Sequence, residues 1–163
     1  MAADTPSPRE LSPADVTLDQ QLCLALYTAS RAMTARYRVA LAPLGLTYPQ
    51  YLVMVLLWEQ GSSSVSEIGH QLSLDSSTLS PLLKRLQAMG LVTRTRATTD
   101  ERLMIIGLTD QGRALQQTEG EVAESMCAAT GLPVVEQLAL TERLRTLTAA
   151  LEKSTTATAA ARA

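Results

Sequence analysis

A capped pair of short helices, followed at once by a β-hairpin, is the feature that most constrains this chain. Ser64-Val65-Ser66-Glu67 is a capping box, in which the first serine and the glutamate satisfy each other's backbone N–H groups. It predicts a short helix that runs to Leu72. Asp75 or Ser76 caps a second helix, which ends at Gly90. Two short helices joined by a tight turn predict a helix-turn-helix.

Two β-prone segments follow the second helix directly. Residues 91–96 alternate in polarity, residues 103–108 are apolar, and a polar turn at 97–101 joins them. Runs of this length around a short polar turn predict a two-stranded hairpin. A hairpin that directly follows a helix-turn-helix is a wing, so this part of the chain predicts a winged helix-turn-helix.

Longer helices are predicted on both sides of this centre. Residues 17 to about 42 are rich in Leu, Ala, Arg and Met, and residues 48–60 are apolar almost all round, which indicates a buried helix. Thr109 caps a helix that runs to about residue 129, and a last helix spans about 134–153. The predicted fold class is mainly α with a small β-wing. Terminal helices cannot bury their apolar faces alone, so we expect the N- and C-terminal helices to form a homodimer interface.

The length of 163 residues, of which 46% are hydrophobic, fits one domain. No apolar run is long enough to span a membrane, and the polar start of the chain does not resemble a signal peptide, so we expect a cytoplasmic protein. We predict one domain at residues 15–153, between flexible tails at 1–14 and 154–163. Within it, the DNA-binding core spans about 62–109, and the dimerisation helices lie at 15–45 and 110–153.

Basic side chains gather around the second short helix and the hairpin, although the net charge of the whole chain is −2. Between residues 84 and 102, five basic against two acidic side chains give a local charge of +3. A helix that enters the major groove contacts bases through its first residues, which here carry small hydroxyl groups. Arginines of a wing can enter a narrow minor groove, and Asp100 can hold Arg102 in place by an ion pair. The predicted DNA-binding residues are Ser76, Ser77, Thr78, Ser80, Lys84, Arg85, Arg94, Arg96, Asp100 and Arg102.

The helix alone leaves an alternative open, because a capped amphipathic helix can simply present a solvated polar face. The wing arginines, placed directly after the helix-turn-helix, favour DNA binding.

The chain has two cysteines, Cys23 and Cys127, and one histidine, His70. Their spacing does not predict a zinc site, so we expect no metal and no cofactor. All four tyrosines lie within the stretch that follows Cys23. A phenol that donates a hydrogen bond to a thiolate stabilises the charged form, which is the form that attacks a peroxide.

Helical geometry separates these tyrosines. Tyr27 lies one turn after Cys23, about 6 Å away on the same face. Tyr37 lies about 21 Å along a straight helix, so it cannot touch Cys23 of its own chain. It can touch Cys23 of a partner whose helix crosses in the antiparallel direction, and Tyr48 can join it from that same partner. The alternative is that the tyrosines and the cysteine only pack a helical dimer core.

Two sets of motifs resemble a known family, and the resemblance covers nearly all of the chain except the two tails. Residues 74–86 resemble the recognition helix of the MarR family, and Asp100-Glu101-Arg102 followed by Leu108-Thr109-Asp110-Gln111-Gly112 resembles its wing. Within that family, the chain resembles the OhrR organic-hydroperoxide sensors of the two-cysteine type. The stretches that carry this second resemblance are Gln21-Leu22-Cys23, Leu26-Tyr27, Ser30-Arg31, Met33-Thr34, Tyr37 and Thr47-Tyr48-Pro49-Gln50-Tyr51.

The resemblance implies a homodimeric repressor that binds a pseudo-palindromic operator in double-stranded DNA. By that resemblance, Cys23 is the thiol that an organic hydroperoxide oxidises to sulfenic acid, and Tyr27, Tyr37 and Tyr48 form its hydrogen-bond network. Cys127 of the other chain then forms an intersubunit disulfide with Cys23, and the operator is released. Because peroxide is consumed stoichiometrically, we expect the protein not to be an enzyme.

Three alternatives stay open. A MarR-type regulator can be released from DNA by a small aromatic or anionic ligand that binds without a covalent bond. A thiol peroxidase needs residues around its cysteine that activate the peroxide, and this sequence lacks that context. A plain dimeric scaffold leaves the wing arginines unexplained.

Overall fold

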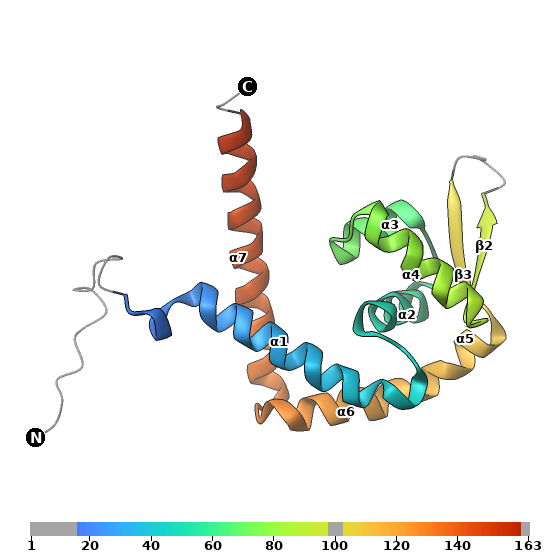
Figure 1. Cartoon of the computed structure of the whole chain (residues 1–163), viewed down its shortest axis with the longest axis horizontal. Helices are drawn as coiled ribbons and strands as arrows, with labels where there is room; N and C mark the ends of the chain where they lie inside the picture. The colour runs from blue at the N-terminus through green and yellow to red at the C-terminus, as the bar shows by residue number, and fades with distance from the viewer. Residues whose placement is uncertain (1–15, 98–102, 161–163) are drawn as a thin grey trace, which may run out of the picture. The chain divides into compact units, whose positions relative to one another are not determined.

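The structure is a computed structural model that describes residues 16–97 and 103–160 (Figure 1). The predicted flexible tail at 1–14 lies outside these residues. The described chain folds as two units, which divide between Gln116 and Gln117. The helices and strands are α1 (Leu22–Ala40), α2 (Tyr48–Gln60), β1 (Ser62–Ser64), α3 (Val65–Leu72), α4 (Ser76–Ala88), β2 (Val92–Arg96), β3 (Met104–Leu108), α5 (Asp110–Ala114), α6 (Glu119–Thr130) and α7 (Val134–Ala160).

The core of the first unit is built around α2, which has the predicted bounds. Val53, Met54 and Leu57 are fully buried, and α3, α4 and the sheet pack close to this helix (Figure 1). The capping box at the start of α3 is present, with the Ser64 Oγ accepting from the Glu67 N–H at 3.1 Å. The predicted fold class, mainly α with a small β-wing, is confirmed by the order of these helices and strands.

The wing belongs to a three-stranded antiparallel sheet with the order β1-β3-β2. The hairpin β2–β3 was predicted, but the strand β1 was not. Its three serines have little preference for strands, and they are extended because they pair with Ile105–Gly107 of β3. Tertiary pairing therefore determines a strand that local sequence does not indicate.

Three helix boundaries differ from the prediction. The first helix begins at Leu22, because residues 18–20 form a separate 3-10 turn and Gln21 is extended. The predicted single helix after Thr109 is divided by a 3-10 segment at Leu115–Thr118, which ends at Thr118, a residue of low helix propensity. The last helix was predicted to end at 153 but continues to Ala160. This end is rich in alanine, and three threonine hydroxyls there donate to the carbonyl four residues earlier.

A buried glycine fixes α5 against the base of the wing. The Trp58 Nε1 donates to the Gly112 carbonyl oxygen at 2.8 Å, and the Thr109 Oγ1 accepts from the Gly112 N–H at 2.9 Å. The same threonine hydroxyl donates to the Gly90 carbonyl oxygen at 2.6 Å. A Cβ on Gly112 would lie only 2.0 Å from the Leu91 carbonyl oxygen, so this close approach requires glycine.

No helix within residues 16–97 and 103–160 is long and apolar enough to cross a membrane. The same residues contain no group of three or more His, Cys, Asp or Glu side chains that could hold a metal ion.

Candidate DNA interface and thiol site

The helix α4 has one buried and one exposed face. Its buried face is leucine: Leu79, Leu82, Leu83 and Leu86. On the other side, Ser80 is half-buried. Five further predicted DNA-binding residues are exposed there: Ser76, Ser77, Thr78, Lys84 and Arg85. Residues four apart on a helix are neighbours, so Ser76, Ser80 and Lys84 lie in one row. The structure therefore places hydroxyl groups at the start of this face and cations after them.

Asp75 caps the start of this face. Its carboxylate accepts from the Ser77 hydroxyl at 2.6 Å and from the Thr78 N–H at 2.7 Å. The hydrogen bond from Ser77, and then that from the Thr78 backbone, lower the pKa of Asp75 below its usual value. The Ser77 hydroxyl proton is committed to this cap, so its oxygen can face DNA only as an acceptor.

This cap predicts a pH dependence of stability. Because the folded pKa of Asp75 lies below the unfolded value of 3.8, the cap stabilises the protein above that pH and is lost as pH falls through the folded pKa. We expect the urea midpoint of the wild type to fall between pH 5 and pH 2 by more than that of Asp75→Asn. The asparagine keeps an acceptor oxygen but does not titrate. An equal fall in both proteins would contradict a role for this carboxylate.

The wing carries Arg94, which is half-buried, and Arg96, which is exposed. In the register of the hairpin, Arg94 pairs with the buried Ile106 and Arg96 with Met104. Alternate residues of a strand share a face, so both arginines lie on the face of the hairpin that carries the buried Val92. Arg96 is the nearer of the two to the tip of the hairpin. Asp100 and Arg102, the predicted ion pair of the wing, lie outside the described residues.

Cys23 lies exposed in the first turn of α1. Tyr27, one turn later, is 58% exposed, and its hydroxyl oxygen accepts a hydrogen bond from the Arg31 Nη1 at 2.9 Å. An arginine only donates, so the Tyr27 hydroxyl keeps its own proton available for another acceptor. Cys23, Tyr27 and Arg31 are spaced four residues apart, which gives one row along the helix.

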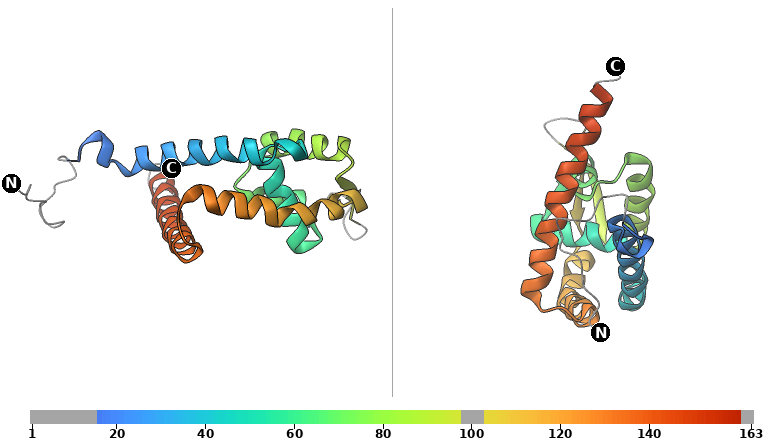
Figure 2. Two further views of the ribbon diagram at one scale, coloured as in Figure 1. Left: turned by 90° about the horizontal axis from the view of Figure 1, so that it is seen from below. Right: turned by 90° about the vertical axis from the view of Figure 1, so that its left-hand side faces the viewer.

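Tyr37 and Tyr48 form a stacked pair, with ring centroids 4.3 Å apart. Burial, and for Tyr37 also the neighbouring Tyr48, raises the pKa of both phenols above the usual value of 10.0. Both groups therefore stay protonated at neutral pH and can donate hydrogen bonds. Because α1 is one unbroken helix (Figure 2), Cys23 stands at its start and Tyr37 near its end. One chain thus brings the two tyrosines together but not the cysteine with them.

An open groove of about 580 Å³ lies between α1 and the start of α2. Arg31 and Arg38 contribute two cations, and Tyr48 contributes a phenol. The sequence reasoning did not single out these arginines. Their spacing of seven residues, which puts both on one helix face, is the signal that could have found them.

Cys127 lies half-buried in the last turn of α6. Its Sγ accepts a hydrogen bond from the Gln137 Nε2 of α7 at 3.0 Å. The sequence did not predict this contact, because the two residues are ten apart and a turn with Gly131 separates their helices. Both cysteines are free thiols.

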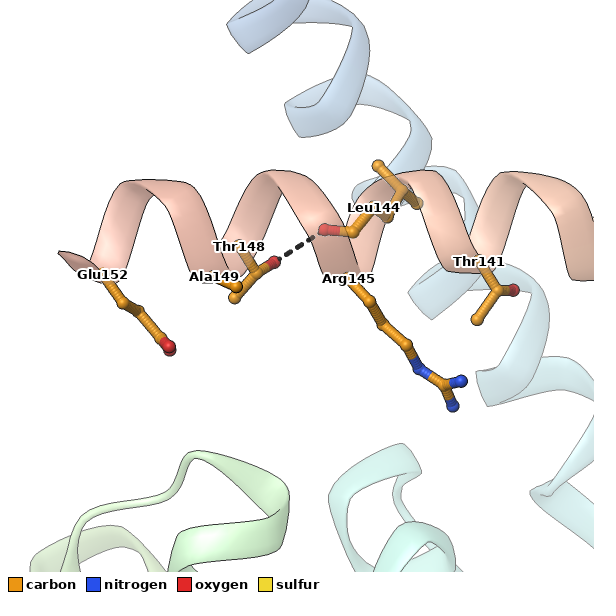
Figure 3. Close-up of a pocket in the computed structure, with 6 residues that line it drawn as sticks. All are labelled: Thr141, Leu144, Arg145, Thr148, Ala149 and Glu152. Atoms are coloured by element: carbon orange, nitrogen blue, oxygen red, sulfur yellow. Dashed lines mark hydrogen bonds between the residues drawn. The ribbon is translucent and has the colours of Figure 1, made fainter. Parts of the chain in front are cut away.

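Apolar side chains remain exposed on the terminal helices. The exposed apolar residues of α1 and the turn before it include Leu18, Leu22, Tyr27, Met33 and Val39. Those of α7 include Val134, Val135, Leu138, Leu140 and Leu151. A shallow depression of about 360 Å³ on α7 is lined by residues of that helix alone, and Arg145 and Glu152 extend from the same side of it (Figure 3). A depression with walls from one helix does not enclose a ligand, but a helix from elsewhere can fill it.

The chain is similar to known regulators in sequence. The family model for transcriptional regulator SarA/Rot matches residues 37–118. The HTH-type transcriptional regulator TtmR of Methylorubrum extorquens (strain PA1) is 47% identical over 131 residues, which cover 80% of this chain and 67% of TtmR. The organic hydroperoxide resistance transcriptional regulator of Bacillus subtilis (strain 168) is 49% identical over 100 residues, which cover 61% of this chain and 68% of that protein.

Solved structures agree with these similarities. Reduced AbfR bound to DNA matches with a TM-score of 0.67 and 39% identity, over 82% of this chain and 94% of AbfR. Disulfide-formed AbfR matches with a TM-score of 0.59 and 40% identity, over 80% of this chain and 91% of AbfR. The similar proteins thus include one regulator that has been solved both on DNA and with a disulfide.

Proposed function

Because the chain belongs to the SarA/Rot family of transcriptional regulators, winged-helix proteins of the MarR superfamily, we propose that it is a repressor released from DNA by oxidation of Cys23. It is a DNA-binding transcriptional regulator. The observation that carries the redox proposal is the exposed Cys23 at one end of α1 and a protonated tyrosine pair at the other. If two copies of α1 cross in the antiparallel direction, Cys23 of one copy lies beside the tyrosine pair of the other.

A homodimer makes the proposed site complete. The exposed apolar side chains of α1 and α7 supply a surface that a second copy can bury. In such a dimer, Tyr27 of one protomer and the Tyr37–Tyr48 pair of its partner can donate hydrogen bonds to one thiolate. The two copies of α4 can then enter successive major grooves of a pseudo-palindromic operator.

The proposed chemistry has two steps. The Cys23 thiolate attacks the outer oxygen of an organic hydroperoxide, the O–O bond breaks, and the alkoxide takes a proton to leave as an alcohol. Cys23 is then a sulfenic acid. The Cys127 sulfur of the partner attacks the Cys23 sulfur, the S–O bond breaks, and hydroxide leaves as water with the proton from Cys127.

Disulfide formation supplies the conformational change. The two Cα atoms must come within about 7 Å for the bond to close. Any movement that this requires passes to the DNA-binding elements, which changes the spacing of the two α4 helices and weakens binding. Cellular thiols reduce the bond and reset the protein. Because each peroxide consumes one thiol pair, we propose a stoichiometric sensor rather than an enzyme.

The experiment uses DNA duplexes selected from a random library by the reduced protein. Wild type, Cys23→Ser and Cys127→Ser are treated with one equivalent of cumene hydroperoxide and examined by gel shift and by non-reducing electrophoresis. We expect the wild type to form a linked dimer, lose DNA and regain it with dithiothreitol. Cys23→Ser should stay bound, and Cys127→Ser should form no linked dimer and should over-oxidise at Cys23. Release of Cys23→Ser equal to that of the wild type would overturn the proposal.

The groove lined by Arg31 and Arg38 favours one second candidate, release by an anionic aromatic ligand. In that case an aromatic carboxylate such as benzoate should release wild type and Cys23→Ser equally. Arg38→Ala should then abolish release by the carboxylate but leave the response to peroxide unchanged.

A further inference from the structure

We propose that Gln137 is a positioning residue for the Cys127 thiol, which it orients and prepares for attack on the oxidised partner. The inference rests on the proposed redox function and adds a group to it. Its basis is the contact across the turn between α6 and α7, where the Gln137 Nε2 lies 3.0 Å from the Cys127 Sγ. Both residues are half-buried, whereas Val134–Glu136 and Leu138–Arg143 on either side of Gln137 are exposed.

The hydrogen-bond pattern determines which end of the Gln137 amide faces the sulfur. The same Nε2 lies 2.9 Å from the Leu132 carbonyl oxygen. A carbonyl oxygen only accepts, so the nitrogen and not the oxygen of the amide must face it. The two N–H groups of this nitrogen are therefore divided between Leu132 and Cys127. The sulfur thus receives a donor held in a fixed direction.

This donor stands in an environment that otherwise opposes negative charge on the sulfur. Cys127 lies in the last turn of α6, where the aligned backbone dipoles give the helix end partial negative charge. The Gln137 amide is the donor that lies against this sulfur in the described part of the chain, and the sulfur is the nucleophile of the second step.

The first test is independent of the redox function. In a Cys23→Ser background, Cys127 is the single cysteine, and its alkylation by iodoacetamide is followed by mass spectrometry at pH 7.5. Gln137→Glu and Gln137→Leu remove both donors, and each should slow alkylation about tenfold. Gln137→Lys keeps an N–H donor and should react at least as fast as the parent. Gln117→Glu is a matched control, because it adds the same charge to an exposed position of the same unit.

The second test measures the disulfide step with both cysteines present. After one equivalent of cumene hydroperoxide, Gln137→Leu should form the linked dimer about tenfold more slowly than the wild type and accumulate sulfenic acid. Gln137→Lys should restore the rate. If Gln137→Leu and Gln137→Lys behave alike in alkylation, the residue has only a packing role and the inference is wrong. If the wild type forms no linked dimer while alkylation still depends on Gln137, the redox proposal fails instead.

Discussion

We expect Gly112→Ala to lower the free energy of unfolding by about 3 kcal/mol. The added Cβ would stand 2.0 Å from the Leu91 carbonyl oxygen, which is backbone and cannot turn aside as a side chain can. The helix α5 must therefore move away from the base of the wing. That movement stretches two hydrogen bonds of Gly112, to the Trp58 indole and to the Thr109 hydroxyl. Urea unfolding followed by tryptophan fluorescence measures the loss, because Trp58 is the single tryptophan.

Gly120→Ala is the matched control. No atom lies within 4 Å of the Cβ that this change adds, and the residue belongs to the first turn of α6. Its stability should be unchanged or raised by about 0.5 kcal/mol, since alanine restricts the unfolded chain more than glycine does. Equal stability of both variants and the wild type would show that α5 does not rest on Leu91 as described.

We expect the double substitution Lys84→Ala/Arg85→Ala to lower affinity for operator DNA about 10- to 100-fold at 0.15 M salt. Both side chains are exposed on the face of α4 opposite its four buried leucines, so their loss should leave the fold intact. If each cation neutralises one phosphate in each half-site, log affinity also falls less steeply with log salt, by about 0.9 per lost contact. Fluorescence anisotropy of a labelled duplex over a salt series measures both quantities.

Arg143→Ala/Lys153→Ala removes the same charge from exposed positions of α7. This control should bind with nearly the wild-type salt slope. If both double variants weaken binding to the same extent, the effect is one of overall charge, and α4 has no special role.

Much of the DNA-binding half was predictable because its local signals agree with its tertiary structure. Ser64 and Thr109 each cap a helix where the sequence pattern indicated. The strand β1 was missed because pairing with β3, rather than its own serines, makes it extended. The break at Leu115–Thr118 was missed because leucine and the two glutamines favour a helix and only Thr118 does not.

The candidate thiol site was predictable only in part. Cys23 and the tyrosines stand out by their clustering, and the length of α1 explains why one chain cannot bring them together. The contact between Gln137 and Cys127 depends on how α7 returns beside the end of α6. The groove with Arg31 and Arg38 depends on the packing of α1 against α2. The spacing of Arg31 and Arg38 puts them on one face of α1 but does not show that the start of α2 lies beside them. No spacing indicates the contact between Gln137 and Cys127.

The short strand β1 has a mechanical consequence. Its pairing occupies the edge of β3 that β2 leaves open, and Val65 begins α3 directly after it. A hairpin without a third strand could rotate about its base. Here such a rotation would break the main-chain hydrogen bonds between β1 and β3, which also fix the start of α3. We expect each DNA-reading head to move as one stiff body. In the homodimer that we propose, we therefore expect regulation to act on the distance between the heads and to leave the shape of each unaltered.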